Sequence, residues 1–116
     1  MAEAVLGRSF TFQVLFVDDD NIPITVDNPV IDIFMFSQLG VLQTLVAAAA
    51  MSEVETGRYA YVFTIPTTLT DGDLLHAEVV ATEPGSGRVL RAYQEVTAIS
   101  VNRGLGGSTG MTARFF

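Results

Sequence analysis

Cysteine and lysine are both absent from this sequence of 116 residues, and each absence excludes a class of protein. Without cysteine, neither a disulfide framework nor a thiolate metal site can form. Without lysine, the six basic residues are all arginines; they face 13 acidic residues, and the formal net charge is −7. Because nucleic acids attract basic surfaces, we do not expect an acidic chain of this kind to bind them.

Long apolar runs are also absent. The longest, Leu45–Met51, is far too short and too weakly hydrophobic to span a bilayer. The first seven residues lack the basic and apolar regions of a signal peptide, so we expect neither such a peptide nor a membrane partner. The length suits one domain, which at this size buries a core without the help of metal or disulfide.

The stretch Thr56–Pro66 has the clearest pattern in the chain. Its large side chains recur at every second residue and therefore share one face of a strand. Small or β-branched residues lie between them, and Gly57 and Pro66 bound the run. We predict a central strand over residues 59–65 whose core-facing side chains are Tyr59, Tyr61, Phe63 and Ile65.

Alternation with a period of two recurs along the rest of the chain. Pro23 cannot donate to a strand ladder, so the strand that contains it is expected at a sheet edge. Four alanines lie within 41–51, so a short helix is the alternative there to a strand that runs into a loop. Strands are expected at 9–16, 22–26, 30–37, 41–51, 74–82 and 88–100, with turns at 18–21, 27–29, 38–40, 71–72 and 83–87.

About seven short strands separated by turn signals are typical of an antiparallel β-sandwich. We therefore expect an all-β fold with a single sandwich domain over residues 8–100. A flexible lead-in is expected over residues 1–7, and a glycine-rich C-terminal arm over residues 101–116.

The arm differs from the body in charge and composition. All 13 acidic residues precede residue 100, whereas the arm contains two arginines and ends on two phenylalanines. Because exposed apolar area costs free energy in water, these aromatics are expected to be buried. They either fold back onto their own domain or dock on another subunit as an aromatic anchor. In the second interpretation the interaction residues are Arg103, Leu105, Met111, Arg114, Phe115 and Phe116.

The polar residues of the sequence form no catalytic or cofactor motif. Asp18–Asn21 could suggest calcium, but the EF-hand spacing is missing and a solvated turn is the better interpretation. His76 is the only histidine, and no nucleophile motif accompanies it. Asp71 and Asp73 could act as an acid–base pair, yet they flank Gly72 in a turn, where solvation is expected. We therefore expect no enzyme activity, no metal and no cofactor.

In the second half of the chain, Met51–Phe63 contains a Thr-Gly-x-Tyr strand, Ile65-Pro66 begins a connection, and Asp71-Gly72-Asp73 is a turn into a final hairpin. This order of motifs resembles that of the immunoglobulin-like domains of tailed-phage virions and bacterial surface proteins. The chain as a whole is similar to phage head decoration, or cement, proteins, which combine one sandwich with an acidic body and an extended arm.

The resemblance implies an immunoglobulin-like sandwich that is made in the host cytoplasm and lies on the outer surface of a capsid. It implies a homotrimer that binds the major capsid protein and stabilises the lattice, with Phe34 and Phe36 involved if the oligomer uses their face. A tail, neck or baseplate subunit is the alternative. A carbohydrate-binding or adhesion module is a further one, although its expected loops contain no aromatic residue for stacking on sugars.

Overall fold

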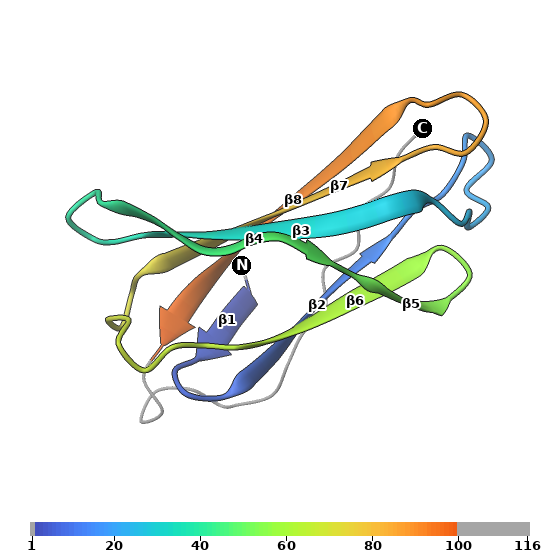
Figure 1. Ribbon diagram of the computed structural model, residues 1–116. Coiled ribbons are helices and arrows are strands. Elements are labelled where there is room, and N and C mark those ends of the chain that lie inside the picture. Colours follow the sequence, from blue (N-terminus) through green and yellow to red (C-terminus); the bar gives the residue numbers. More distant parts are fainter. Residues whose placement is uncertain (1, 100–116) are drawn as a thin grey trace.

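The computed structural model describes residues 2–99, and these residues form two β-sheets (Figure 1). One sheet has five strands in the order β1-β8-β7-β3-β4, and the other has three in the order β2-β6-β5. Within this described part, no helix is long and apolar enough to cross a membrane. The strands are β1 (Ala2–Val5), β2 (Ser9–Leu15), β3 (Asp27–Phe36), β4 (Leu42–Ala50), β5 (Ser52–Glu55), β6 (Arg58–Thr64), β7 (Leu74–Thr82) and β8 (Val89–Ile99).

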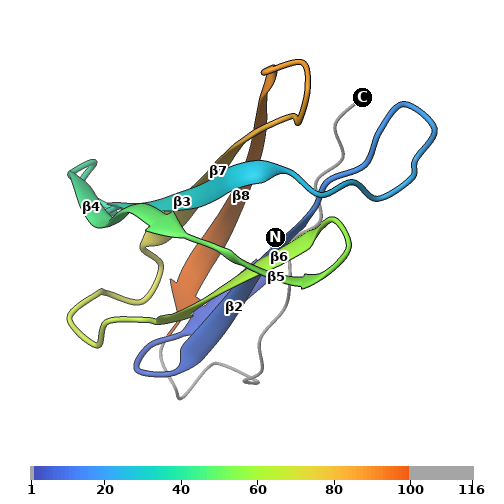
Figure 2. The ribbon, with the colours of Figure 1, turned by 45° about the vertical axis from the view of Figure 1, so that its right-hand side comes forward.

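The strand order defines the class of fold. The two sheets form separate layers in Figure 2, and the chain crosses between them four times, namely from β1 to β2, from β2 to β3, from β4 to β5 and from β6 to β7. All strand pairs are antiparallel except β1 and β8, which are parallel. The division of β2, β6 and β5 from β3, β7 and β8 is that of strands B, E and D from C, F and G in immunoglobulin domains. The predicted all-β sandwich is confirmed, with eight strands in the described residues where about seven were expected.

The core lies between the two sheets, where the predicted alternation fills it from both sides. β2, β7 and β8 alternate between buried residues and residues that are half-buried or exposed along almost their whole length. Packing of two such inner faces is what holds a β-sandwich together. The largest fully buried side chains are Phe10, Phe12, Phe16, Ile31, Ile33, Ile65, Leu75, Val14, Val79 and Val96.

The predicted central strand corresponds to β6, which lies between β2 and β5 in the smaller sheet. Tyr59 and Ile65 are buried, whereas Tyr61 and Phe63 are half-buried and pack against the edge of the core. The Tyr59 hydroxyl accepts a hydrogen bond from the Val26 N–H (2.9 Å) and donates one to the Val26 carbonyl (3.3 Å). The aromatic face of this strand therefore contacts the core, and one of its hydroxyls fixes the segment that leads into β3.

The Tyr59→Phe variant is expected to be less stable by about 1–2 kcal/mol at neutral pH, because the buried Val26 N–H loses its partner. Burial, and secondarily the charge of Glu53, raises the pKa of Tyr59 above its ordinary value of 10.0. The folded state therefore keeps this proton where the unfolded state releases it, so the contribution of Tyr59 to stability is present below pH 10 and is lost as the pH rises further. Urea unfolding at pH 7 and at about pH 11 should show the difference between wild type and Tyr59→Phe shrinking at high pH. A difference that stays constant would contradict this interpretation.

The ambiguous region 41–51 is a strand, β4, and no part of it is helical. The alanine run is extended because it pairs with β3. Met51, which follows it, is buried between β4 and β5, where the chain passes from one sheet to the other. The strand that follows, β5, was not predicted. All four of its residues are exposed, so its sequence has no alternation between buried and exposed positions.

Three expectations about the first third of the chain are wrong. Residues 1–7 are not all a flexible lead-in, because Ala2–Val5 forms β1 and pairs with the end of β8. Residues 22–26 form no strand; Pro23 makes a single bridge with Val17. The turn expected at 27–29 lies inside β3, where Asn28 has a φ of 50° and the pairing with β7 shifts register.

Candidate interaction surface

The acidic turn at 18–21 uses its own carboxylate to hold its backbone. The Asp18 carboxylate accepts hydrogen bonds from the N–H groups of Asp20 (2.8 Å) and Ile22 (3.0 Å). Asn21 adopts a φ of 63°, which short polar side chains tolerate better than most. The prediction of a solvated turn is confirmed at this position.

The second turn that was considered for chemistry contains a buried carboxylate, contrary to expectation. Asp73 is buried, and its Oδ2 accepts the Thr70 N–H at 2.8 Å. The backbone of the same turn is tied to Ala98 by hydrogen bonds from and to residues 72 and 73. Asp73 thus stabilises the connection between the two sheets. Asp71 is only half-buried, so the two carboxyl groups do not share one environment.

His76 lies on the outer face of the five-stranded sheet, on β7. It pairs across the sheet with Phe34 on one side and Glu95 on the other, and its ring centroid lies 5.7 Å from that of Tyr93. Within residues 2–99, no three histidine, aspartate or glutamate residues gather in a way that could hold a metal ion. The surroundings of His76 are therefore aromatic and acidic.

A shallow hollow lies beside His76 on this outer face. Its volume is about 390 Å³, and Phe34, Phe36, Leu42, His76, Glu78 and Glu95 line it. The Glu78 carboxylate is engaged by Arg91 at 3.2 Å. The floor of the hollow is mostly apolar, so it suits a side chain of another protein better than a polar reactant.

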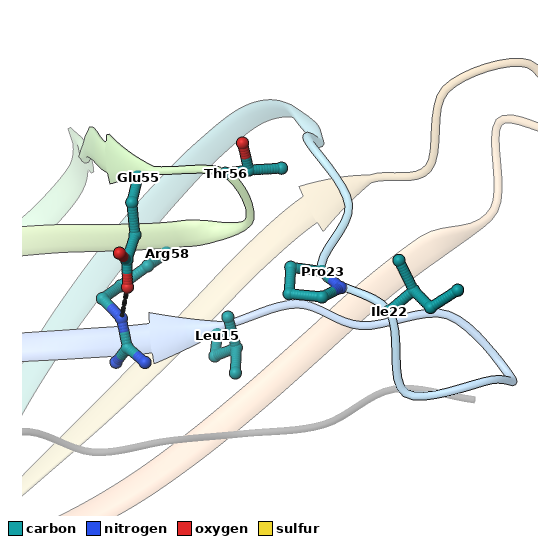
Figure 3. Close-up of a pocket in the computed structure, with 6 residues that line it drawn as sticks. All are labelled: Leu15, Ile22, Pro23, Glu55, Thr56 and Arg58. Carbon is teal, nitrogen blue, oxygen red and sulfur yellow. Dashed lines mark hydrogen bonds and ion pairs between the residues drawn. The ribbon is translucent and has the colours of Figure 1, made fainter.

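Figure 3 shows a second hollow, which has a volume of about 530 Å³. It is open and lies between the end of β2, the Ile22-Pro23 segment and the β5–β6 turn. Its two charged residues, Glu55 and Arg58, form an ion pair of 2.6 Å with each other. Because these charges neutralise one another, this hollow offers no obvious group to recognise a charged ligand.

The hairpin between β3 and β4 carries large apolar side chains on its surface. It projects beyond the strands of the smaller sheet, at the left of Figure 1. Four side chains define what we call the hairpin patch, namely Phe36, Leu39, Val41 and Leu42, with exposed fractions of 42, 93, 60 and 55%. Clustered exposed apolar residues on a soluble domain typically mark sites of interaction.

Hydrogen bonds fix the position of this hairpin. The Ser37 N–H donates to the Val41 carbonyl (2.9 Å), and the Ser37 hydroxyl accepts the Val41 N–H (3.0 Å). The Gln38 side chain donates to the carbonyl of Asp71 at 2.6 Å, which ties the hairpin to the turn before β7. The hairpin patch is thus presented by an ordered part of the fold, which lowers the entropic cost of binding through it.

The six residues predicted to make interactions, namely Arg103, Leu105, Met111, Arg114, Phe115 and Phe116, lie outside the described residues. The structure does place Phe34 and Phe36 together on the outer face, next to the shallow hollow. Sequence reasoning missed the exposed residues Leu39, Val41 and Leu42. A usable signal was present, because residues 33–52 contain no charged side chain in a chain of net charge −7.

Protein-family models give no match to this sequence, and neither do the curated proteins. A role for this chain therefore has to be argued from its fold and its surface.

Proposed function

We propose that this chain is a non-enzymatic structural protein of a tailed-phage virion, a head decoration protein that binds the outside of the capsid and stabilises it. The observation that carries the proposal is the hairpin patch, an ordered apolar projection on an otherwise acidic immunoglobulin-like sandwich. Such a surface favours adhesion to another protein and supplies no group for catalysis. The sequence motifs shared with phage immunoglobulin-like domains point to the same role.

In this proposal the sandwich is a rigid body that joins neighbouring subunits of the major capsid protein. The hairpin patch provides a contact between sister copies, and the C-terminal segment provides the contact with the capsid through Arg114, Phe115 and Phe116. That segment carries two arginines and no acidic residue, so it approaches acidic surfaces that repel the rest of the chain. Many copies on a symmetric lattice make weak single contacts effective through avidity. The protein is then made in the host cytoplasm and ends on the capsid surface.

A capsid-binding assay tests the proposal. The full chain is mixed with expanded capsids that lack it, and the bound fraction is measured by sedimentation. We expect saturable binding, and we expect the Arg114→Ala/Phe115→Ala/Phe116→Ala variant to bind at least about tenfold more weakly, since aromatic and arginine anchors dominate interfaces. Ser108→Ala/Thr109→Ala, in the same segment, is the matched control and should bind like the wild type.

The other possible results of this assay would contradict part of the proposal or favour one of the alternative functions. Unchanged binding of the triple variant would remove the C-terminal segment from the interface. Binding to tails, necks or baseplates without binding to capsids would replace head decoration by a tail, neck or baseplate role. Binding to neither, together with specific binding on a glycan array, would favour a carbohydrate-binding or adhesion module.

A further inference from the structure

The outer edge of β4 meets no other described strand and is regular only over its first residues, beside the hairpin patch. β4 pairs with β3 in continuous register from Leu42 to Thr44, after which the register shifts, and Ala48 has a φ of 49°. Among the described strands, none pairs with the other side of β4. Because bulges turn a strand edge away from a partner, the open part of this edge is the short segment Leu42–Thr44.

The other free edges differ from this one. Two of the four residues of β5 are glutamates, and β1 contains Glu3. β2 has no exposed residue after Ser9. Charged side chains are a usual means by which proteins protect sheet edges from pairing. Leu42–Thr44 has neither a charge nor a proline, and exposed apolar side chains surround it.

The distribution of charge indicates what can approach this edge. Two copies of a chain with net charge −7 repel each other over most of their surfaces. Residues 33–52, which include the hairpin patch and all of β4, contain no charged side chain. Two copies can therefore approach each other through this segment with less repulsion than elsewhere. An antiparallel strand edge is also self-complementary, because a two-fold axis brings the same donors and acceptors of two copies opposite one another.

We propose that the hairpin patch is a self-association site, where β4 of one copy pairs antiparallel with β4 of a second copy about a two-fold axis. Gln43 then lies opposite Gln43 of the second copy, and Leu42 opposite Thr44. Phe36, Leu39 and Leu42 of both copies lose exposed apolar area, which drives the association. The paired segment is short, so we expect a dissociation constant in the micromolar range, on the order of 1–100 µM. This association needs no capsid and does not depend on the proposed function.

Analytical ultracentrifugation of the full chain tests the proposal. At about 0.15 M salt, where repulsion between distant charges is screened, the mass should rise with concentration from 12.5 kDa toward twice that value. Leu39→Glu places a charge on a side chain that is 93% exposed, so folding should be unaffected while the dimer is at least about tenfold weaker. Val54→Glu, on the exposed edge strand β5, is the matched control and should associate like the wild type.

A crosslinking arm tests the register, because the chain has no native cysteine. Opposed residues of antiparallel strands have Cα atoms about 4.5–5.5 Å apart, a separation that a disulfide spans. A thiol oxidant should therefore join two Gln43→Cys chains much faster than two Val54→Cys chains. A wild-type mass that stays at one chain up to about 1 mM would overturn the association. Unweakened association of Leu39→Glu, or a mass of three chains, would overturn the two-fold arrangement.

Discussion

Replacing Gly57 with alanine is expected to destabilise the protein by about 3 kcal/mol. Gly57 has a φ of 79°, where an L-residue with a side chain costs about 1–2 kcal/mol. A Cβ at this position would also lie 2.8 Å from the Phe16 carbonyl oxygen and 2.9 Å from the Ile24 nitrogen. These two atoms form a hydrogen bond of 3.0 Å with each other, so the backbone cannot move away without weakening it.

Gly85→Ala is the matched control for Gly57→Ala. Gly85 has a φ of 87°, but a Cβ there would meet nothing within 4 Å. We expect Gly85→Ala to cost about 1 kcal/mol, which isolates the effect of the close approach at Gly57. Urea unfolding measures both free energies, and thermal unfolding should place the Gly57→Ala midpoint about 10 °C below that of the wild type. Equal losses for the two variants would show that the close contact contributes nothing.

Gly57 also shows what the sequence could predict and what it could not. Its place before an alternating run marked the start of the predicted strand, and β6 does begin directly after it, at Arg58. Its contact with Phe16 and Ile24 depends on how a segment much earlier in the chain lies against it, and local sequence patterns contain no information on such a contact. The same reason explains why the strand predicted at 22–26 is wrong. The apolar alternation around Pro23 is typical of a strand, but the segment pairs with the rest of the fold only through the single bridge between Pro23 and Val17.

Short or exposed elements were the other source of error. β1 has four residues, so its alternation is too brief to distinguish from chance, and its burial comes from parallel pairing with β8. β5 is exposed throughout and has no alternation at all. By contrast, β7 and β8 were predicted within one residue at each end, because they are long and alternate clearly across the core.

The interaction surface was predicted only in part, for a related reason. Alternation placed Phe34 and Phe36 on the face opposite Ile31 and Ile33, and burial confirms this division. Alternation shows which residues share a face of a strand, but it does not show how far along the strand a second sheet covers that face. Leu39 is exposed because the hairpin extends past the smaller sheet, so its surroundings depend on the relative lengths of strands in two layers. Only the absence of charge over 33–52 marks this segment in the sequence.

Phe12→Ala and Phe36→Ala are expected to distinguish aromatic residues that stabilise the core from aromatic residues that mediate self-association. Phe12 is fully buried and contacts the Phe10 ring edge-on at a centroid distance of 4.7 Å. Its truncation leaves a cavity between the sheets and should cost about 3–5 kcal/mol. Phe36 is 42% exposed at the end of β3, so its truncation should cost about 1 kcal/mol in the monomer.

The second measurement on these variants is self-association, which should give the opposite ranking. At temperatures where both variants are folded, Phe12→Ala should associate like the wild type, because its side chain lies in the core and away from the hairpin patch. Phe36→Ala should associate about tenfold more weakly, because it removes a central apolar contact. Phe36→Ala could instead lose as much stability as Phe12→Ala and associate like the wild type. The side chains of the hairpin patch would then stabilise the fold and not the association. The outer face would then have no adhesive role.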